Sequence, residues 1–158
     1  MEYLMTYGWA ILIMLVVVAV LFYLGVFNQT STPKRCTLQA GFTCYDYGLY
    51  ANESNTQMYL DLGQATGRTI NVTGINCTSS SVDLPVPGDI TEGILIASGA
   101  HVVVANGSSP TDLVICCNGT SGPCKAKFAI RYTNVDSPTI VRTIYGDISG
   151  PVETLSGI

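Results

Sequence analysis

The stretch that decides the fold is residues 4–27, LMTYGWAILIMLVVVAVLFYLGVF, which contains no charged side chain. As an α-helix rising about 1.5 Å per residue, these 24 residues extend roughly 36 Å, more than the roughly 30 Å hydrocarbon core of a bilayer. In lipid a lone strand would leave its backbone amides unsatisfied, so a helix is the viable spanning form. Apolar residues would occupy every face of it. The stretch therefore predicts a helix that sits in lipid or inside other protein.

The rest of the chain is polar without being charged. Only 11% of all residues are charged, less than half of the roughly 25% typical of soluble domains, which argues against an ordinary cytosolic enzyme. The 131 residues after position 27 are enough for one domain with a real core. A net charge of −4 without a basic run argues against specific nucleic-acid binding.

Short β-like segments follow the connector that contains Pro33. Alternation of apolar and polar residues predicts half-buried strands at 58–62 and 70–77, with Gly74 marking a bulge. Further strands are expected at 94–97 and 102–104, both buried, and at 113–117. The last is a hairpin formed by 126–132 and 140–145, in which Ala126, Phe128, Ile130 and Tyr132 share one face while Lys125, Lys127 and Arg131 share the other. We therefore predict an α+β chain with a long N-terminal helix and a small antiparallel β-sandwich, immunoglobulin-like in size, of seven or eight strands.

Six cysteines all lie after the apolar run, which favours disulfides over free thiols. The simplest scheme joins Cys36 to Cys44, Cys117 to Cys124, and Cys77 to Cys116. Six cysteines allow 15 connectivities, and Cys116 and Cys117 are interchangeable in this scheme. Zinc would need clustered ligands such as C-x-x-C pairs, and the sequence has none and a single histidine.

Asparagine-linked glycosylation triplets indicate an extracellular body. We expect at least three of them to carry glycans, although the Ser- and Thr-rich composition makes their number only a modest excess over chance. The six triplets begin at Asn28, Asn52, Asn71, Asn76, Asn106 and Asn118.

The charges beside the apolar run conflict with an extracellular body. Lys34 and Arg35 follow the run, and the positive-inside rule would place that side in the cytoplasm. A short basic leader that preceded Met1 and was removed would resolve the conflict. A secretory signal peptide is the other reading, but the run is too long and lacks an N-terminal base.

No constellation of residues predicts catalysis, a cofactor or a metal. His101 beside a Val-rich strand is expected to be a packed or surface residue, because no nucleophile stands at a recognisable spacing. Asp83 and Asp89 flank a Pro-rich loop but lack the ligand density of a calcium loop. Tyr45, Tyr47 and Tyr50 form either an outer patch or, more ordinarily, packing residues.

The beginning of the chain resembles the archaeal type IV pilin family, which includes archaeal pilins and archaellins. The residues that carry the resemblance are 1–12, MEYLMTYGWAIL, and 21–27, LFYLGVF; the body matches more loosely through Cys36, residues 41–44 and residues 146–150. The resemblance implies a homopolymeric extracellular filament. It also implies a prepilin peptidase that removes a leader in the membrane, and an assembly ATPase with a membrane platform.

The resemblance also assigns an assembly role to the N-terminal residues. Glu2 is matched to the family's helix carboxylate, which would pair with the α-amino group of a neighbouring copy, since a buried cation needs a partner. The alternative is that Glu2 only favours the helix dipole. The expected assembly residues are Met1, Glu2, Tyr3, Leu4, Gly8 and Trp9.

These observations predict three parts and leave rival functions. We expect a hydrophobic helix at 1–30, a connector at 31–35 and an extracellular, disulfide-stapled β domain at 36–158, without enzymatic activity. The rivals to a filament subunit are a membrane-anchored surface domain with a single span, and a minor pilin or adhesin that acts as a binding module.

Overall fold

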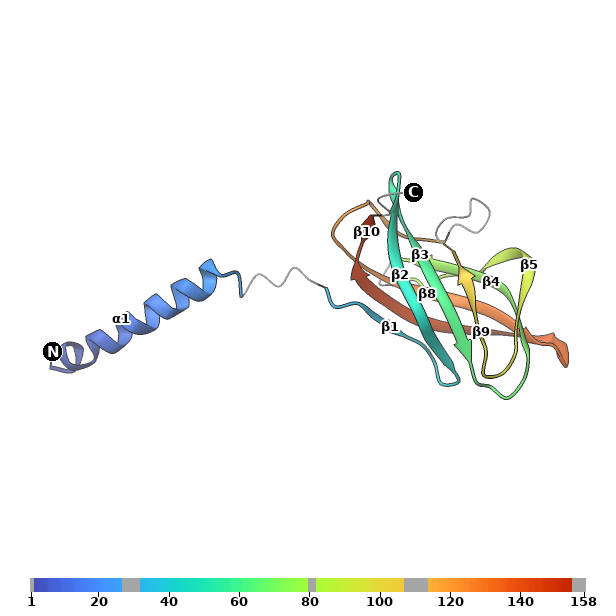
Figure 1. The fold of residues 1–158 in the computed structure, drawn as a ribbon, viewed down its shortest axis with the longest axis horizontal. Coiled ribbons are helices and arrows are strands. Elements are labelled where there is room, and N and C mark those ends of the chain that lie inside the picture. Colours follow the sequence, from blue (N-terminus) through green and yellow to red (C-terminus); the bar gives the residue numbers. More distant parts are fainter. Residues whose placement is uncertain (1, 27–31, 80–81, 107–113, 155–158) are drawn as a thin grey trace. The chain divides into compact units, whose positions relative to one another are not determined.

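The chain divides into two compact units, Met1–Ser31 and Thr32–Ile158 (Figure 1). The structure, a computed structural model, describes residues 2–26, 32–79, 82–106 and 114–154. It has the predicted α+β composition, an N-terminal helix followed by a mostly antiparallel β unit. The elements are α1 (Glu2–Tyr23), β1 (Arg35–Thr37), β2 (Phe42–Asn52), β3 (Asn55–Gln64), β4 (Ile70–Thr78), β5 (Gly88–Ile96), β6 (His101–Ala105), β7 (Ile115–Asn118), β8 (Pro123–Asn134), β9 (Ser137–Pro151) and β10 (Glu153–Thr154).

Helix α1 ends before the apolar run does. Gly25 adopts a positive φ of 69°, and the Val26 N–H donates to the Leu21 carbonyl at 3.2 Å, so a left-handed glycine closes the helix. The apolar run to Phe27 predicted a longer helix. Glycine also occurs inside apolar helices, so Gly25 did not mark the end of the helix in the sequence. With 22 residues α1 still extends about 33 Å, enough to cross a bilayer core.

The β unit consists of two five-stranded sheets. The first has the strand order β1-β9-β8-β4-β5 and is antiparallel throughout. The second has the order β10-β2-β3-β6, with β7 also paired to β3, and its β10–β2 pair is parallel. The described residues thus contain ten strands rather than seven or eight. Strands β1 and β10 are too short to show a periodic pattern, and β2 mixes aromatic and polar side chains on both faces.

Side chains of both sheets contribute to one hydrophobic core. The ring of Phe42 on β2 lies 5.2 Å from that of Tyr132 on β8, measured between centroids. The inward face predicted for 126–132 is confirmed, since Ala126, Phe128, Ile130 and Tyr132 are all buried, but Ala129 on the opposite face is buried too. A core shared by both sheets ties the long hairpins β2–β3 and β8–β9 (Figure 1) into the same unit.

A glycine lies where this core leaves no space for a side chain. Gly146 on β9 pairs with Phe128 on β8. A Cβ atom at position 146 would lie 2.5 Å from the Phe128 ring, 2.6 Å from the Thr37 carbonyl oxygen and 2.8 Å from the Leu38 side chain. The close approach of β1 to β9 therefore requires glycine at this position.

Two predicted burial patterns need correction. Residues 94–97 and 102–104 were expected to form buried strands, yet Leu95 is 61% exposed and Val102 and Val103 are only half-buried. Leu95 alternates with the buried Ile96, so its side chain lies on the outward face of β5. On β3 the alternation predicted an outward Asp61, and this residue is buried, because side chains from β2 and β6 lie over it. The bulge predicted at Gly74 is confirmed by a register shift between Val72 and Gly74.

Candidate functional site

Helix α1 presents an apolar surface on all sides. None of its described residues is buried, and Tyr3 and Trp9 are 81% and 68% exposed. By length and composition the helix is able to cross a membrane, a property that signal sequences near an N-terminus share. Burying about twenty such side chains favours an apolar environment by tens of kcal/mol as an upper bound. Such a helix needs lipid or protein around it.

The polar groups of α1 are few and lie at its start. The Thr6 hydroxyl donates to the Glu2 carbonyl oxygen at 3.0 Å, so it is satisfied inside the helix and does not require water. Glu2 is exposed in the first turn, where the helix dipole favours a carboxylate. Leu4 is exposed as well, and a Cβ atom at Gly8 would meet no other atom within 4 Å. Met1 lies outside the described residues.

Three disulfides staple the β unit. They join Cys36 to Cys44, Cys77 to Cys116, and Cys117 to Cys124, the same pairs as in the simplest scheme. The Cys77–Cys116 bond connects β4 in the first sheet to β7 in the second, and both of its cysteines are buried. Together with an apolar N-terminal helix, these bonds are compatible with a membrane-anchored or secreted surface protein.

The predicted glycosylation sites differ in accessibility. Asn52, Asn106 and Asn118 are exposed. Asn76 is half-buried, and its Nδ2 donates to the Val86 carbonyl oxygen at 2.8 Å. Asn71 is half-buried, and its amide lies directly over Gly93. Asn28 lies outside the described residues.

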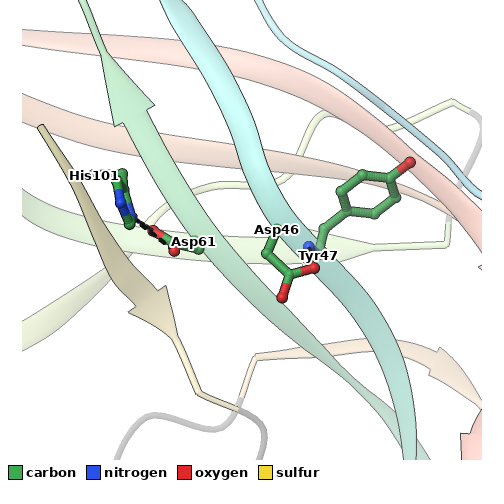
Figure 2. Close-up of polar contacts among 4 residues, drawn as sticks. All are labelled: Asp46, Tyr47, Asp61 and His101. Carbon is green, nitrogen blue, oxygen red and sulfur yellow. Dashed lines mark hydrogen bonds and ion pairs between the residues drawn. The ribbon is translucent and has the colours of Figure 1, made fainter. Parts of the chain in front are cut away.

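A polar cluster that the sequence did not predict lies on the outer face of the second sheet. Figure 2 shows the imidazole of His101 on β6 facing the carboxylate of Asp61 on β3, with Nδ1 2.9 Å from Oδ2 and 3.1 Å from Oδ1. The Tyr45 ring stacks on this imidazole with 3.8 Å between centroids. Only 8% of Asp61 remains exposed.

This cluster has the character of a structural contact between neighbouring strands. In the part of the chain that the structure describes, the His101 imidazole has hydrogen bonds to Asp61 alone, so no hydroxyl or thiol stands where a nucleophile would. Asp61 and His101 are 40 residues apart and meet only because β3 pairs with β6. No local motif signals such a pair.

The carboxylates of this region affect a neighbouring tyrosine. On β2 the Asp46 carboxylate accepts the Tyr47 backbone N–H at 2.8 Å (Figure 2). Partial burial, then Asp46 and Asp61, and finally Tyr50 raise the pKa of the Tyr59 hydroxyl above its usual value near 10. Tyr59 is therefore a neutral hydrogen-bonding group at physiological pH.

The search for metal sites covered the described residues, and the comparisons with known proteins covered the sequence. Among the described residues, no group of three or more His, Cys, Asp and Glu side chains is placed to hold a metal ion. The Asp89 carboxylate instead pairs with the Arg131 guanidinium. A scan against protein-family models found no match, and a search of the curated proteins found no relative.

Proposed function

We propose that this protein is a structural subunit of an extracellular filament like the archaeal type IV pilus, polymerised through its N-terminal helix and without enzymatic activity. The observation that carries the proposal is α1, a 22-residue helix with no buried residue and apolar side chains on every face. Such a helix suits two environments in turn, lipid before assembly and neighbouring copies of itself afterwards. An apolar helix could also serve only as a membrane anchor. The resemblance of residues 1–12 and 21–27 to archaeal pilins favours its use in a filament.

The start of the helix provides the polar contact that such a core needs. In the proposed filament, the Glu2 carboxylate pairs with the α-amino group of another copy, which would otherwise be a buried, unpaired cation. The Thr6 hydroxyl needs no partner on a neighbouring copy, because it already donates a hydrogen bond to the Glu2 carbonyl oxygen. The small residues Gly8 and Ala10 permit close approach of helices.

The β unit would form the outer coat of the filament. We propose that its two sheets pack as a sandwich of immunoglobulin-like size, held by the Cys77–Cys116 bond between them. Three disulfides and exposed sequons at Asn52, Asn106 and Asn118 suit an extracellular surface. The proposed partners are further copies of this chain, the membrane before assembly, a prepilin peptidase, and an assembly ATPase with its platform.

Electron microscopy of filaments sheared from cells that produce the full-length protein tests this function. Mass spectrometry of the main band should identify this chain as the principal component. Detergent-soluble monomers without filaments would favour the membrane-anchored surface domain with a single span. Filaments that contain this chain at low abundance would favour the minor pilin or adhesin.

Variants at Glu2 test its assigned role separately. Glu2→Ala should prevent assembly while the protein still accumulates in the membrane, because the neighbouring α-amino group loses its partner. Glu92→Ala is the matched control, since it removes an exposed carboxylate from β5 of the β unit. Normal filaments from Glu2→Ala would refute the pairing role and leave only the dipole effect.

A further inference from the structure

A hollow of about 470 Å³ opens on the first sheet, over β1, β9 and β8. Three of the seven lysine and arginine residues in the whole chain line it, namely Arg35, Lys125 and Lys127. In a protein of net charge −4 this is a concentration of positive charge. Hydroxyls of Ser79 and Ser149 also contribute to the lining.

Strand register explains how these side chains come together. Residues two apart on a strand face the same side of a sheet, so paired positions form rows across neighbouring strands. Cys36, Ile148 and Ala126, which lie between the two rows, point to the core side. The rows that line the hollow are Arg35–Ser149–Lys125 and Thr37–Asp147–Lys127.

The three cations of the hollow outnumber its one carboxylate, Asp147, which lies directly opposite Lys127 on the neighbouring strand. Arg35, Lys125 and Lys127 form no ion pair with any residue of the described ranges. By contrast, Lys34 Nζ lies 3.6 Å from the Glu153 carboxylate, and Arg131 pairs with Asp89. The sequence pattern placed Lys125 and Lys127 on the outward face of their strand, but it could not place Arg35 beside them. Their charge is available to a ligand.

A second hollow of about 250 Å³ continues the first. It shares Thr37, Lys127 and Asp147 with the larger hollow and adds the ring of Tyr145, the next outward residue along β9. The groove formed by both hollows therefore offers cations, hydroxyls, one carboxylate and one aromatic ring, together with the apolar residues Leu38 and Leu84. This mixture of groups differs from a site for a simple anion. A carboxylate such as Asp147 would repel a simple anion.

We propose that this groove binds an acidic saccharide, a sugar chain that carries carboxylate or sulfate groups. Arg35, Lys125 and Lys127 would bind the anionic groups, with Arg35 able to make a two-pronged contact. Asp147 would accept hydrogen bonds from sugar hydroxyls, and Tyr145 would lie against an apolar face of a sugar ring. The site is independent of the proposed filament, because every residue in it belongs to the β unit.

Direct binding to the full-length chain in zwitterionic detergent micelles tests the site. The probes are an oligogalacturonate for carboxylate, a heparin oligosaccharide for sulfate, and a maltooligosaccharide as the neutral control, each titrated calorimetrically at about 50 mM salt to limit screening. At least one acidic probe should bind and the neutral probe should not. The acidic probe that binds more tightly identifies the anionic group.

Substitutions separate a built site from general charge attraction. Lys125→Gln combined with Lys127→Gln should weaken binding about fivefold or more, since two charge-assisted contacts are lost. The exposed Lys125→Gln alone gives a smaller weakening and serves if the double variant misfolds. The matched controls Arg68→Gln and Arg142→Gln remove one positive charge elsewhere in the β unit and should preserve binding.

Asp147→Asn gives the sharpest contrast. An acidic saccharide that uses this carboxylate should bind several-fold more weakly to the variant, although the variant is more positive. Tighter binding to Asp147→Asn would reveal nonspecific anion attraction and overturn the proposal. Equal binding of the neutral probe, equal losses in the control variants, or no binding of either acidic probe would overturn it too.

Discussion

The Tyr45 ring lies flat against the His101 imidazole, with 3.8 Å between centroids and 8° between their planes. Tyr45 belongs to β2 and His101 to β6, so this contact spans the strand β3 that separates them in the sheet. The carboxylate of Asp61 on β3 is bonded to Nδ1 of the same imidazole. His101 thereby connects a buried carboxylate on β3 to an aromatic ring on β2, and this arrangement leads to the first prediction.

His101→Ala should lower the free energy of unfolding by about 1–2 kcal/mol, because the buried Asp61 carboxylate loses its hydrogen-bonding partner while His101 itself is half-exposed. Urea unfolding of the full chain in detergent micelles, followed by circular dichroism, measures the change. The control repeats the substitution in an Asp61→Asn background, where the loss should be smaller. An equal loss in both backgrounds would disprove the coupling between the two residues.

The disulfides should contribute unequally to stability. Replacing Cys77 and Cys116 by alanine opens a loop of 39 residues, whereas replacing Cys117 and Cys124 opens one of 7. Loop-closure entropy then predicts losses of about 4 and about 2.5 kcal/mol, respectively. Urea unfolding of both double variants, with the remaining bonds verified by non-reducing peptide mapping, gives the comparison. A larger loss from the short loop would contradict this ranking.

Gly146→Ala should destabilise the β unit by about 1–3 kcal/mol, since a methyl group there overlaps the Phe128 ring and the Thr37 carbonyl oxygen, which is backbone and cannot rotate away. Gly150→Ala is the matched control on the same strand, because a Cβ atom there would lie 3.5 Å from Lys34 in ordinary contact. Thermal unfolding of both variants measures the difference. Similar midpoints would show that β1 does not approach β9 this closely.

Glycans should occur on Asn52, Asn106 and Asn118, whose side chains are exposed, and not on Asn76, whose Nδ2 is bonded to the Val86 carbonyl. Glycopeptide mass spectrometry of protein from its native cells measures occupancy at each site. An intact mass equal to that of the bare polypeptide would refute glycosylation. Occupancy at Asn76 with Asn52 and Asn118 unmodified would refute the accessibility argument.

Local sequence patterns predicted the elements whose apolar residues form a continuous run or alternate regularly with polar residues. The apolar run yielded α1, and the alternation at 126–132 yielded β8 with its inward, buried face. The two closely spaced disulfides also followed from spacing. Strand β2 was not predicted as a strand, because its residues FTCYDYGLYAN mix aromatic and polar side chains on both faces. Its place in the sheet depends on pairing with β3.

Contacts between distant residues escaped the sequence patterns. Asp61 and His101 are 40 residues apart in the sequence. Arg35 and Lys125 line the same hollow only because β9 pairs with both of their strands. The exposed Leu95 was misjudged because an apolar run does not reveal that one face of the strand points outward. The polar cluster around Asp61 and His101 and the groove over β1, β9 and β8 therefore both depend on strand order. Local sequence patterns do not predict strand order.

Cryo-electron microscopy of filaments sheared from producing cells tests the central claim most directly. The account predicts a helical polymer whose axis is filled by α1 of many copies, packed about 8–10 Å apart, with the disulfide-stapled β units outside. Density for the Glu2 side chain should meet the N-terminus of a neighbouring copy. A filament built by contacts between β units with α1 outside its core, or cells with abundant protein and no filament containing it, would contradict the claim.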